Sequence, residues 1–521
     1  MYPEQFFATV KKHIRREWVV CFVSAFVFGF IAHFYKFVNW LPNWDSIVFR
    51  YDAQDMAHLG RWFLGAACLP STYYELPWLN SLLSMFYLAL AAVCVCRMFR
   101  VRTSVAAALT GGLMAAFPTV TSTLTYCYVA DGYCMALLFA VLSAMLIDDG
   151  GKKRLVAGGA LLTLTLGIYQ AYISVTILLL LIKLIERLIF DGETAKESLQ
   201  RAGRFLVCGV SAGVLYLIIV FLSLKITNTP LSDYLGLDSN SSSFNLLYLP
   251  RVLYHCAKTF EGFFFNLENG ISLYAVLNAV MLCALIWLII CAAKRGGLFK
   301  SPSRTLLLIV YSVAAPICAS PLYFISPGTA YHNLMTMGFY AFYLFFILFY
   351  ERLGDAPERF VKRKNWGILL LSAVMLFNFT LISNVAYHKL QLAFYSSYGE
   401  AIRMADRIEQ TDGTSECDTL AVLGIMPGSE AYSAQVSLDL TGVTDGSLLR
   451  PDDYTVNQSV ITSTLNDYCR KNFKFATADE RRALAQNPEV LAMPMWPESG
   501  SVAVVDGYIV IRLSEGSGLY D

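Results

Sequence analysis

Apolar segments with the length of a membrane-spanning helix recur along this chain up to about residue 390. In lipid, a helix of about 20 apolar residues crosses the hydrocarbon core and satisfies its own backbone groups. Charged residues make up only 15% of the sequence, against about 25% in soluble domains. The sequence therefore predicts an all-α polytopic membrane protein. About eleven spans are expected, at residues 18–36, 77–96, 103–118, 130–147, 154–170, 172–190, 204–224, 271–293, 305–325, 335–350 and 366–386.

Basic residues gather in alternate connections between these segments, and the opposite connections contain fewer Lys and Arg. Basic loops stay preferentially in the cytoplasm. The N-terminus is therefore expected in the cytoplasm, and an odd number of spans places the C-terminal residues outside. The six basic connections are KKHIRRE (11–17), RMFRVR (97–102), GKKR (151–154), KESLQRAGR (196–204), AAKRGGLFKSPSR (292–304) and ERFVKRK (358–364).

Residues 388–521 differ from the rest because charged and polar residues return and no further spanning run occurs. DTLAVLGIM and SVAVVDGYIVIRL have the pattern of strands bounded by turn residues. TADERRALAQ has the pattern of a helix capped by Thr477. We therefore expect a transmembrane domain over 1–387 and a small α/β or α+β extracytoplasmic domain over 388–521. Cys417 and Cys469 in this domain fit either a disulfide or two free thiols.

The bulk properties exclude several classes of function. The net charge is +1, so no basic field favours a nucleic-acid partner. The 13 cysteines include no CxxC pair, which argues against a zinc or iron–sulfur site. Neither a P-loop nor a dinucleotide-binding fingerprint is present.

The first outer connection holds an unusual density of charge for this chain. The stretch PNWDSIVFRYDAQDMAHLGRW (42–62) directly follows the first apolar segment. Unpaired charge is costly beside a membrane, which indicates a polar site. A helix over 53–64 would place its apolar side in the membrane interface and its polar side toward a cavity. The alternative is a solvated loop with tryptophan anchors. The ionisable residues are Asp45, Arg50, Asp52, Asp55, His58 and Arg61.

Four further outer segments carry polar residues. The segment FPTVTSTLTYCYVADGYC (117–134) contains Tyr126, other hydroxyl-bearing residues and Asp131, a pattern that suits sugar contact. Asp131 fits equally well as the N-terminal cap of the next helix. In GIYQAYIS (167–174), Gln170 and Tyr172 fit either substrate contact or a buried interhelical hydrogen bond. Residues 225–270 include Arg251, and SPLYFISPGTAYHNLM (320–335) includes His332. Arginine binds phosphate in a bidentate fork, and a carboxylate can accept a proton from a hydroxyl.

Three of these motifs resemble the bacterial type II O-antigen glucosyltransferase family, which is similar to the wider GT-C class. They are WDS…LGRW, FPTVTSTLTYCYVADGYCMAL and LGIYQAYIS. The resemblance covers about the first 390 residues. It implies a multi-span bundle with outer juxtamembrane helices in the bacterial cytoplasmic (inner) membrane. The implied donor is a sugar, typically glucose, on polyprenyl phosphate, and the implied acceptor is a lipid-linked or surface glycan.

The resemblance also implies roles for individual residues. Asp45 matches the family's acidic residue in the first outer loop, the expected base for direct displacement, although Trp44 stands where the family often has His. Arg61 matches the GRW motif and is expected to bind the donor phosphate, together with His332 and Arg251. The expected substrate-binding residues are Asp52, Asp131, Tyr126, Gln170 and Tyr172. Some GT-C enzymes use a divalent metal and others do not, so the resemblance leaves the cofactor open; Asp45, Asp52 and Asp55 could form an oxygen site for Mg²⁺ or Mn²⁺.

Two other functions fit the same sequence less well. A transporter or flippase of lipid-linked saccharide would need polar groups through the middle of the membrane on several helices. Here the ionisable groups lie near the outer ends of the spans. A non-enzymatic scaffold would use residues 388–521 to bind a polymer, and deletion of that domain would distinguish it from an enzyme.

Overall fold

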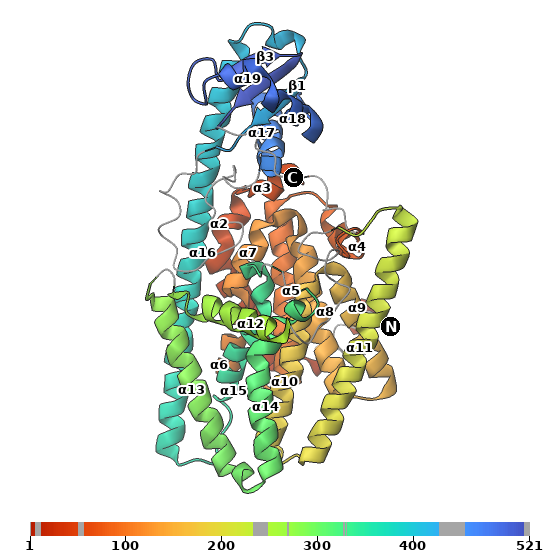
Figure 1. Cartoon of the computed structure of the whole chain (residues 1–521). Helices are drawn as coiled ribbons and strands as arrows, with labels where there is room; N and C mark the ends of the chain where they lie inside the picture. The colour runs from red at the N-terminus through yellow and green to blue at the C-terminus, as the bar shows by residue number, and fades with distance from the viewer. Residues whose placement is uncertain are drawn as a thin grey trace.

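The computed structural model describes residues 2–5, 12–50, 57–232, 248–267, 270–326, 329, 331–426 and 454–514. Within these residues, eleven helical segments run up and down a bundle (Figure 1). They are α2 (Arg16–Val38), α5 (Pro77–Met98), α6 (Ser104–Ala115) with α7 (Pro118–Thr125), α8 (Cys127–Asp149), α9 (Lys152–Ile168), α10 (Ile173–Phe190), α11 (Ala195–Thr227), α13 (Leu273–Arg295), α14 (Pro302–Cys318), η8 (Asn333–Phe339) with α15 (Tyr340–Leu348), and α16 (Glu358–Glu409).

Each predicted span coincides with one of these segments, so the mostly helical fold is confirmed. Among the described residues, seven helices are long and apolar enough to cross a membrane, and two shorter helices are also apolar. Helix α11 shows the expected lipid-facing character because many of its apolar side chains, such as Leu206, Val210 and Phe221, are exposed. These helices indicate a multi-pass membrane protein, while the number eleven stays a prediction.

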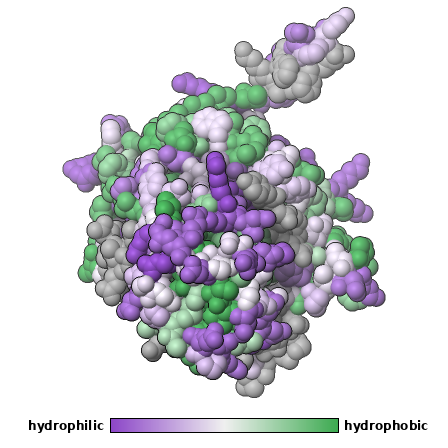
Figure 2. Space-filling model, turned by 90° about the horizontal axis from the view of Figure 1, so that it is seen from above, coloured by the Kyte–Doolittle hydropathy of each residue, from purple (hydrophilic) through white to green (hydrophobic). Residues whose placement is uncertain are grey.

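The two ends of the bundle differ in what connects the helices. We call the end at the top of Figure 1 the upper end. It carries α3 (Trp44–Val48), α4 (Leu64–Cys68), η1 (Leu69–Ser71), η2 (Gln170–Tyr172), α12 (Leu249–Phe264) and η7 (Pro321–Phe324). Helix α12 lies across the bundle instead of along it (Figure 1). Seen from above, with the C-terminal sheet region nearest the viewer, hydrophilic residues gather near the middle of the view and hydrophobic residues lie at several places around its margin (Figure 2).

The opposite end, which we call the lower end, collects the turns near residues 99–103, 150–151, 191–194, 296–301 and 349–357. The described parts of all six basic connections lie here, as their alternation in the sequence predicts. The side of the membrane that each end faces stays a prediction.

Small residues let α2 and α6 cross closely. A Cβ atom added at Gly111 would lie 2.2 Å from the carbonyl oxygen of Cys21. The Ser24 hydroxyl donates to the Ala108 carbonyl at 2.7 Å across the same crossing. A Cβ atom added at Gly112 or at Gly158 would lie 2.8 Å from a side-chain atom of a neighbouring helix, whereas one added at Gly159 would have its nearest neighbour at 3.5 Å. Backbone proximity of this kind is what small residues provide in membrane helix packing.

Residues 410–426 and 454–514 form a small layer of helices on a mixed sheet, as the sequence predicts. The strands are β1 (Thr419–Leu423), β2 (Lys474–Phe475), β3 (Val502–Val505) and β4 (Tyr508–Arg512), in the order β2-β1-β4-β3. Strand β1 is parallel to β2 and β4, and β3 is antiparallel to β4. The helices are α17 (Tyr454–Cys469), α18 (Ala478–Gln486) and α19 (Pro488–Ala492).

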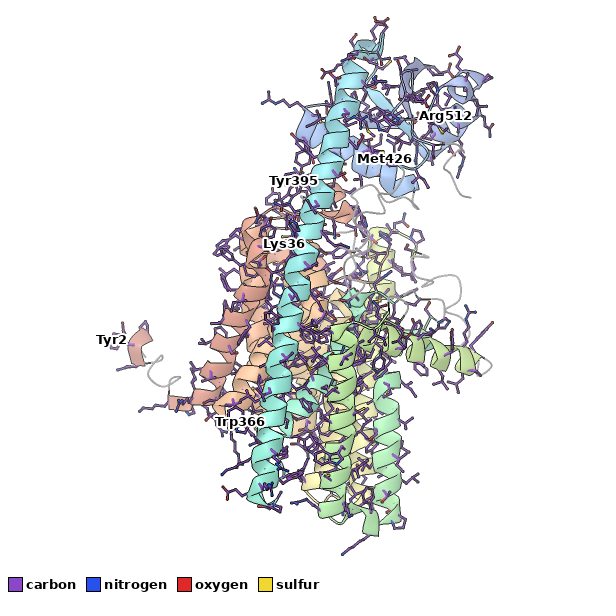
Figure 3. The ribbon with its side chains drawn as sticks, turned by 90° about the vertical axis from the view of Figure 1, so that its left-hand side faces the viewer. Tyr2, Lys36, Trp366, Tyr395, Met426 and Arg512 are labelled. Carbon is purple, nitrogen blue, oxygen red and sulfur yellow. The ribbon has the colours of Figure 1, made fainter. Side chains whose placement is uncertain are left out.

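Two local predictions for this region can be checked. Thr477 caps α18 as expected, in a reciprocal capping box with Glu480. Cys417 and Cys469 are free thiols. Helix α16 runs unbroken through the boundary expected at 387/388, from Trp366 near the lower end past Tyr395 into the sheet region (Figure 3). The division into two domains stays a prediction.

The close crossing of α2 and α6 gives a stability test. Gly111→Ala should lower the free energy of unfolding by about 1–3 kcal/mol, because its methyl group collides with the backbone at Cys21. Gly203→Ala on α11 is the matched control, since a Cβ there meets nothing within 4 Å. The thermal unfolding midpoint of the purified proteins measures the difference. Equal midpoints for the two variants would contradict the crossing.

Candidate active site

Asp45 lies in the first turn of the short helix α3 at the upper end. The helix begins because the Asn43 side chain accepts a hydrogen bond from the Ser46 backbone N–H at 2.9 Å. A carboxylate in the first turn is stabilised by the helix dipole. Ser46 is buried, and its hydroxyl donates to the Thr125 carbonyl at the end of α7 at 3.3 Å. Asp45 itself is half-buried, so its carboxylate combines partial solvent access with a fixed position.

The residues Gly60, Arg61 and Trp62 interlock with the GIYQAYIS segment. Gly60 has a φ of +70°, and a Cβ there would lie 2.5 Å from the Tyr216 hydroxyl. The Trp62 ring lies against Gly167, where a Cβ would come within 2.6 Å of it. The Phe63 N–H donates to the Gly167 carbonyl at 2.8 Å. Two motifs about a hundred residues apart in the sequence therefore form one structural unit.

Arg61 is buried, with 8% of its surface exposed, and is held by tyrosines. Its Nη1 donates to the Tyr133 hydroxyl at 3.1 Å. Its guanidinium lies 5.3 Å from the centroid of the Tyr169 ring, in a cation–π contact. The Tyr133 and Tyr169 rings stack at 4.5 Å. This packing fixes the guanidinium plane, which is the geometry that bidentate phosphate binding requires.

Tyr128 connects the two predicted residues. Its side chain is fully buried, and its hydroxyl has no hydrogen-bond partner among the described residues. The charges of both Asp45 and Arg61 act on this hydroxyl, so the two groups share one neighbourhood. The Tyr128 ring stacks with Phe49, just beyond α3, at 6.0 Å. Sequence reasoning did not select Tyr128 as a site residue, because a tyrosine among many hydroxyls gives no distinguishing signal.

Glu75 is a second carboxylate behind α3, and sequence reasoning missed it. It is 7% exposed, and its carboxylate lies 4.0 Å from the Lys36 ammonium at the upper end of α2 (Figure 3). Trp40 and Ser46 lie beside it. Burial raises the pKa of Glu75 to about 7, although the positive charge of Lys36 opposes this shift. A signal existed: Glu75 is the one charged residue in the sequence between Arg61 and Arg97.

Asp131 is enclosed in the packing of α4, α5 and α8. It is 0% exposed, and its Oδ1 accepts a hydrogen bond from the Asn80 amide at 3.1 Å. A Cβ at the adjacent Gly132 would lie 2.7 Å from the Cys68 sulfur, so α4 presses closely on this turn. Tyr126 is the N-cap residue of α8, so the interpretation of Asp131 as the helix cap is wrong. Its role toward substrate stays a prediction.

The hydroxyl groups of α7 are buried and bond to neighbouring helices. Because these groups already have protein partners, most of the hydroxyl density that suggested sugar contact holds the bundle together. Tyr126 is buried with 8% exposure, where α7 meets α8. The pairs are Thr119–Thr336 at 2.8 Å, Thr121–Ser383 at 2.7 Å, Ser122–Asn333 at 3.2 Å and Thr123–Tyr172 at 3.4 Å.

Gln170 and Tyr172 have structural partners as well. The Gln170 amide donates to the Leu59 carbonyl at 2.9 Å and to the Tyr216 hydroxyl at 3.1 Å. The interhelical hydrogen bond, one of the two interpretations from the sequence, is therefore present. Tyr172 is 2% exposed and packs edge-on against Tyr169, beside Arg61. Contact of either residue with substrate stays a prediction.

His332 lines a cavity of about 320 Å³ at the upper end, between α12 and η8. Lys258 and Glu261, an ion pair at 3.6 Å, contribute charge to its wall. Asn333 belongs to this wall and accepts the hydrogen bond from Ser122 on α7. Helix α7 therefore separates the cavity from the Tyr172–Tyr169–Arg61 group. Arg251 is exposed on α12, where its Nε lies 3.4 Å from the His255 ring nitrogen, and it does not line this cavity.

Part of the first outer connection lies outside the described residues. Asp52 and Asp55 fall in 51–56, so their predicted roles are not placed. The predicted helix over 53–64 is wrong for its described part: residues 57–63 form turns, and α4 begins only at Leu64. No group of three metal-ligating side chains occurs among the residues that the structure describes. Of the three carboxylates that the sequence suggests for a divalent metal, only Asp45 lies within the described residues.

The C-terminal region packs directly on α3. Trp44 and Ile47 share an apolar core with Val460 and Leu465 of α17. Just after α3, Arg50 donates to the Tyr468 hydroxyl at 2.9 Å and pairs with Asp467 at 3.2 Å. The Arg50 guanidinium also lies 4.5 Å from the Trp40 ring centroid. The helix that carries Asp45 is therefore held between the bundle and the sheet region.

Burial of Glu75 predicts a pH dependence of stability. Its pKa rises from about 4.5 to about 7 on folding, so between these values the folded state binds a proton that the unfolded state has lost. Stability should therefore fall as pH rises through this window, by at most about 1.4 kcal/mol per pH unit. Glu75→Gln should remove this contribution from the slope of unfolding midpoint against pH.

The control for this measurement is Glu416→Gln, which changes an exposed carboxylate and should keep the wild-type slope. Slopes between pH 5 and 7 are compared instead of single midpoints, because the substitution also changes the packing beside Lys36 and so shifts the midpoint by an amount that does not depend on the titration of Glu75. A Glu75→Gln slope equal to that of the wild type would contradict the assignment.

Comparison with known proteins identifies the family of this chain. A family model described as Glucosyl transferase GtrII matches residues 34–350, more than half of the chain. The matched range contains α3, Arg61, α7, η2 and His332, and it ends before α16. A search of curated proteins finds no match. The match confirms the resemblance drawn from the three sequence motifs. The chain belongs to the GtrII glucosyl transferase family and is a membrane glycosyltransferase.

Proposed function

We propose that the protein transfers a sugar, most simply glucose, from a polyprenyl-phosphate donor to a surface or lipid-linked glycan at the upper end of the bundle. The observation that carries this proposal is that α8 contacts the surroundings of both residues: Tyr128 stacks on Phe49, just beyond the helix that carries Asp45, and Tyr133 accepts the hydrogen bond of Arg61. A fixed guanidinium and a partly solvated carboxylate at one end of an apolar bundle suit a lipid phosphate and an incoming hydroxyl.

The proposed step is a direct displacement that inverts the anomeric centre. The Asp45 carboxylate accepts the proton of the acceptor hydroxyl, and the acceptor oxygen attacks the anomeric carbon. The bond between that carbon and the phosphate oxygen breaks, and its electron pair leaves with the polyprenyl phosphate. Arg61 stabilises the added negative charge, and Tyr133 and Tyr169 keep its fork in position. Water later takes the proton from Asp45.

The cavity beside α12 is the proposed acceptor side. It combines the aromatic residue Tyr331, the amides of Asn266 and Asn333, and the Lys258–Glu261 pair. Polar groups of this kind among aromatic faces suit a saccharide. His332 on its wall is proposed to contact the substrate. We place the upper end outside the cytoplasmic membrane of a bacterium and the N-terminus inside, because the basic connections gather at the lower end.

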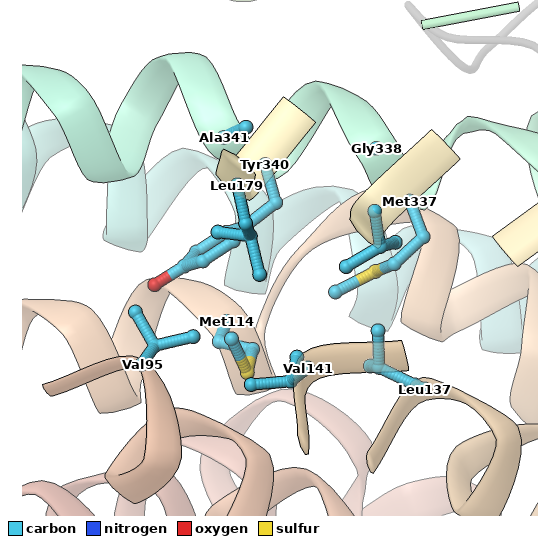
Figure 4. Close-up of a pocket in the computed structure, with 10 residues that line it drawn as sticks. Val95, Met114, Leu137, Val141, Leu179, Met337, Gly338, Tyr340 and Ala341 are labelled. Atoms are coloured by element: carbon cyan, nitrogen blue, oxygen red, sulfur yellow. The ribbon is translucent and has the colours of Figure 1, made fainter. Parts of the chain in front are cut away.

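The packing of the bundle's interior supports an enzyme over a flippase. A cavity inside the bundle measures about 10 Å³ and is lined by apolar side chains such as Met114, Leu137 and Val141 (Figure 4). The hydroxyl of Tyr340, another lining residue, already donates to the Thr110 carbonyl at 2.8 Å. This space is about the size of one water molecule, whereas a passage for a glycan needs a continuous polar lining.

Asp45→Asn should lower the rate of sugar transfer at least about 100-fold, because the amide cannot accept the proton. Arg61→Lys should also lose activity, since an ammonium cannot reproduce the planar fork. The assay uses membranes containing the protein, polyprenyl-phosphate glucose and a lipid-linked glycan. Asp412→Asn and Arg363→Lys change exposed residues elsewhere and should keep wild-type rates. Full activity of Asp45→Asn with an unchanged unfolding midpoint would refute its role as the base.

The contact between Arg50 and α17 gives a separate test of how α3 is held. Asp467→Asn and Tyr468→Phe should each lower kcat several-fold, because a looser α3 places Asp45 less well. Asp479→Asn breaks a comparable ion pair with Arg482, at 2.9 Å on α18, and should leave kcat unchanged. If the docking variants match this control, the C-terminal region does not position the base.

A further inference from the structure

A large polar cavity lies at the lower end, opposite the candidate active site. Its volume is about 450 Å³, and it is bordered by the ends of α5, α8 and α10, by α11, and by the turn that follows α15. Seven of its lining side chains are cationic and four are carboxylates, an excess of three positive charges. The proposed sugar transfer takes place at the other end of the bundle and uses none of these residues.

Four of the seven cations already have carboxylate partners. Arg352 and Lys183 both pair with Glu186, and Arg352 donates to the Phe99 carbonyl at 3.2 Å, so these three charged side chains form one connected cluster. The carboxylates in these pairs are largely buried, which keeps the cations in place. The other pairs are Arg187–Asp148 at 2.8 Å, Lys183–Glu186 at 2.6 Å and Arg201–Glu193 at 2.9 Å.

The remaining three cations are Arg97, Arg100 and Arg102, and they make no ion pair with any side chain in the described part of the chain. All three come from the end of α5 and the turn that follows it. The lining cations that lack an ion-pair partner therefore all lie in one short segment.

The backbone of this segment is fixed before any ligand arrives. Arg100 has a φ of +55°, a conformation that costs energy for a residue with a Cβ. The Arg102 N–H donates to both oxygens of the Glu351 carboxylate, at 2.9 and 3.0 Å, and the Thr103 hydroxyl donates to the same group at 2.7 Å. The three guanidinium groups thus extend from a rigid turn.

Two donors in the same cavity lack acceptors. The Nε–H groups of Arg187 and Arg352 are buried, and neither has a hydrogen-bond partner among the described residues. Buried donors are normally satisfied by protein, water or ligand. These two Nε–H groups are buried away from the open space, so the evidence for a site that takes an acceptor-rich anion is the three guanidinium groups that make no ion pair among the described residues.

We propose that this cavity binds a phosphate-bearing anion at the lower face of the membrane protein. Phosphate oxygens match the guanidinium fork, and several arginines together exceed what a single carboxylate would need. The phosphate can come from the headgroup of an anionic phospholipid or from a soluble phosphate compound. The competing explanation is that these arginines only neutralise the helix C-terminal dipoles and obey the positive-inside bias, which predicts no bound ligand.

The test uses the full-length protein in neutral detergent with two probes, phosphatidylglycerol and inorganic pyrophosphate. Arg97→Gln/Arg100→Gln/Arg102→Gln removes the three unpaired cations. The matched control is Lys152→Gln/Lys153→Gln/Lys196→Gln, which removes three exposed lower-end charges outside the cavity. Binding is measured by the unfolding midpoint at constant ionic strength and by retention of lipid in native mass spectrometry.

We expect at least one probe to raise the midpoint of the wild type and of the lysine variant, and we expect the arginine variant to need at least about tenfold more probe. A response to phosphatidylglycerol alone identifies a headgroup, and a response to pyrophosphate alone identifies a soluble ligand. No response in the wild type, or equal losses in both triple variants, would overturn the proposal. If the arginine variant does not fold, displacement of retained phosphatidylglycerol from the wild type by pyrophosphate supports it, and failure of both probes to bind overturns it.

Discussion

The cost of burying charge at the edge of an apolar bundle governs the upper end of this protein. Arg61, Lys36 and Glu75 are all almost inaccessible to solvent, which would be strongly unfavourable for isolated ions. Arg61 is compensated by the Tyr133 hydroxyl and the Tyr169 ring, while Lys36 and Glu75 lie 4.0 Å apart. Arg61 and Glu75 lie in the connections between helices, so the same contacts that make the charges tolerable also attach these connections to α8, to Tyr169 at the start of η2, and to α2.

This arrangement explains why three sequence motifs belong together. Gly60 and Gly167 permit backbone approaches that a Cβ would block, and those approaches bring Arg61 to the stacked tyrosines. The hydroxyls of α7 then link this group to η8 and the His332 cavity through Ser122 and Asn333. The proposed donor and acceptor sides are therefore neighbours across a single short helix.

The C-terminal region takes part in the same architecture although the family match ends at residue 350. Helix α16 leaves the bundle without a break and joins the sheet region, and α17 packs on α3. The helix that carries the candidate base thus packs on the region that follows the family portion of the chain. At the lower end, α8, α10 and the turn after α15 also carry ion pairs, but cationic side chains outnumber carboxylates in the lining of the cavity there.

The sequence by itself determined the helical segments, the clustering of basic connections at one end, the cap at Thr477 and the choice of Asp45 and Arg61. Each of these follows from local properties: the length of an apolar run, the charge of a connection, or a short motif. The tertiary structure decided the rest. In the folded protein, Asp131 is buried, and Gln170 and the α7 hydroxyls have protein partners. Glu75 and Tyr128 lie close to α3, the helix that carries Asp45. These outcomes depend on which helices meet, as with Arg50 and Tyr468, which are 418 residues apart in the sequence and 2.9 Å apart in space. No local pattern encodes such a distance, because it results from the packing of the whole bundle.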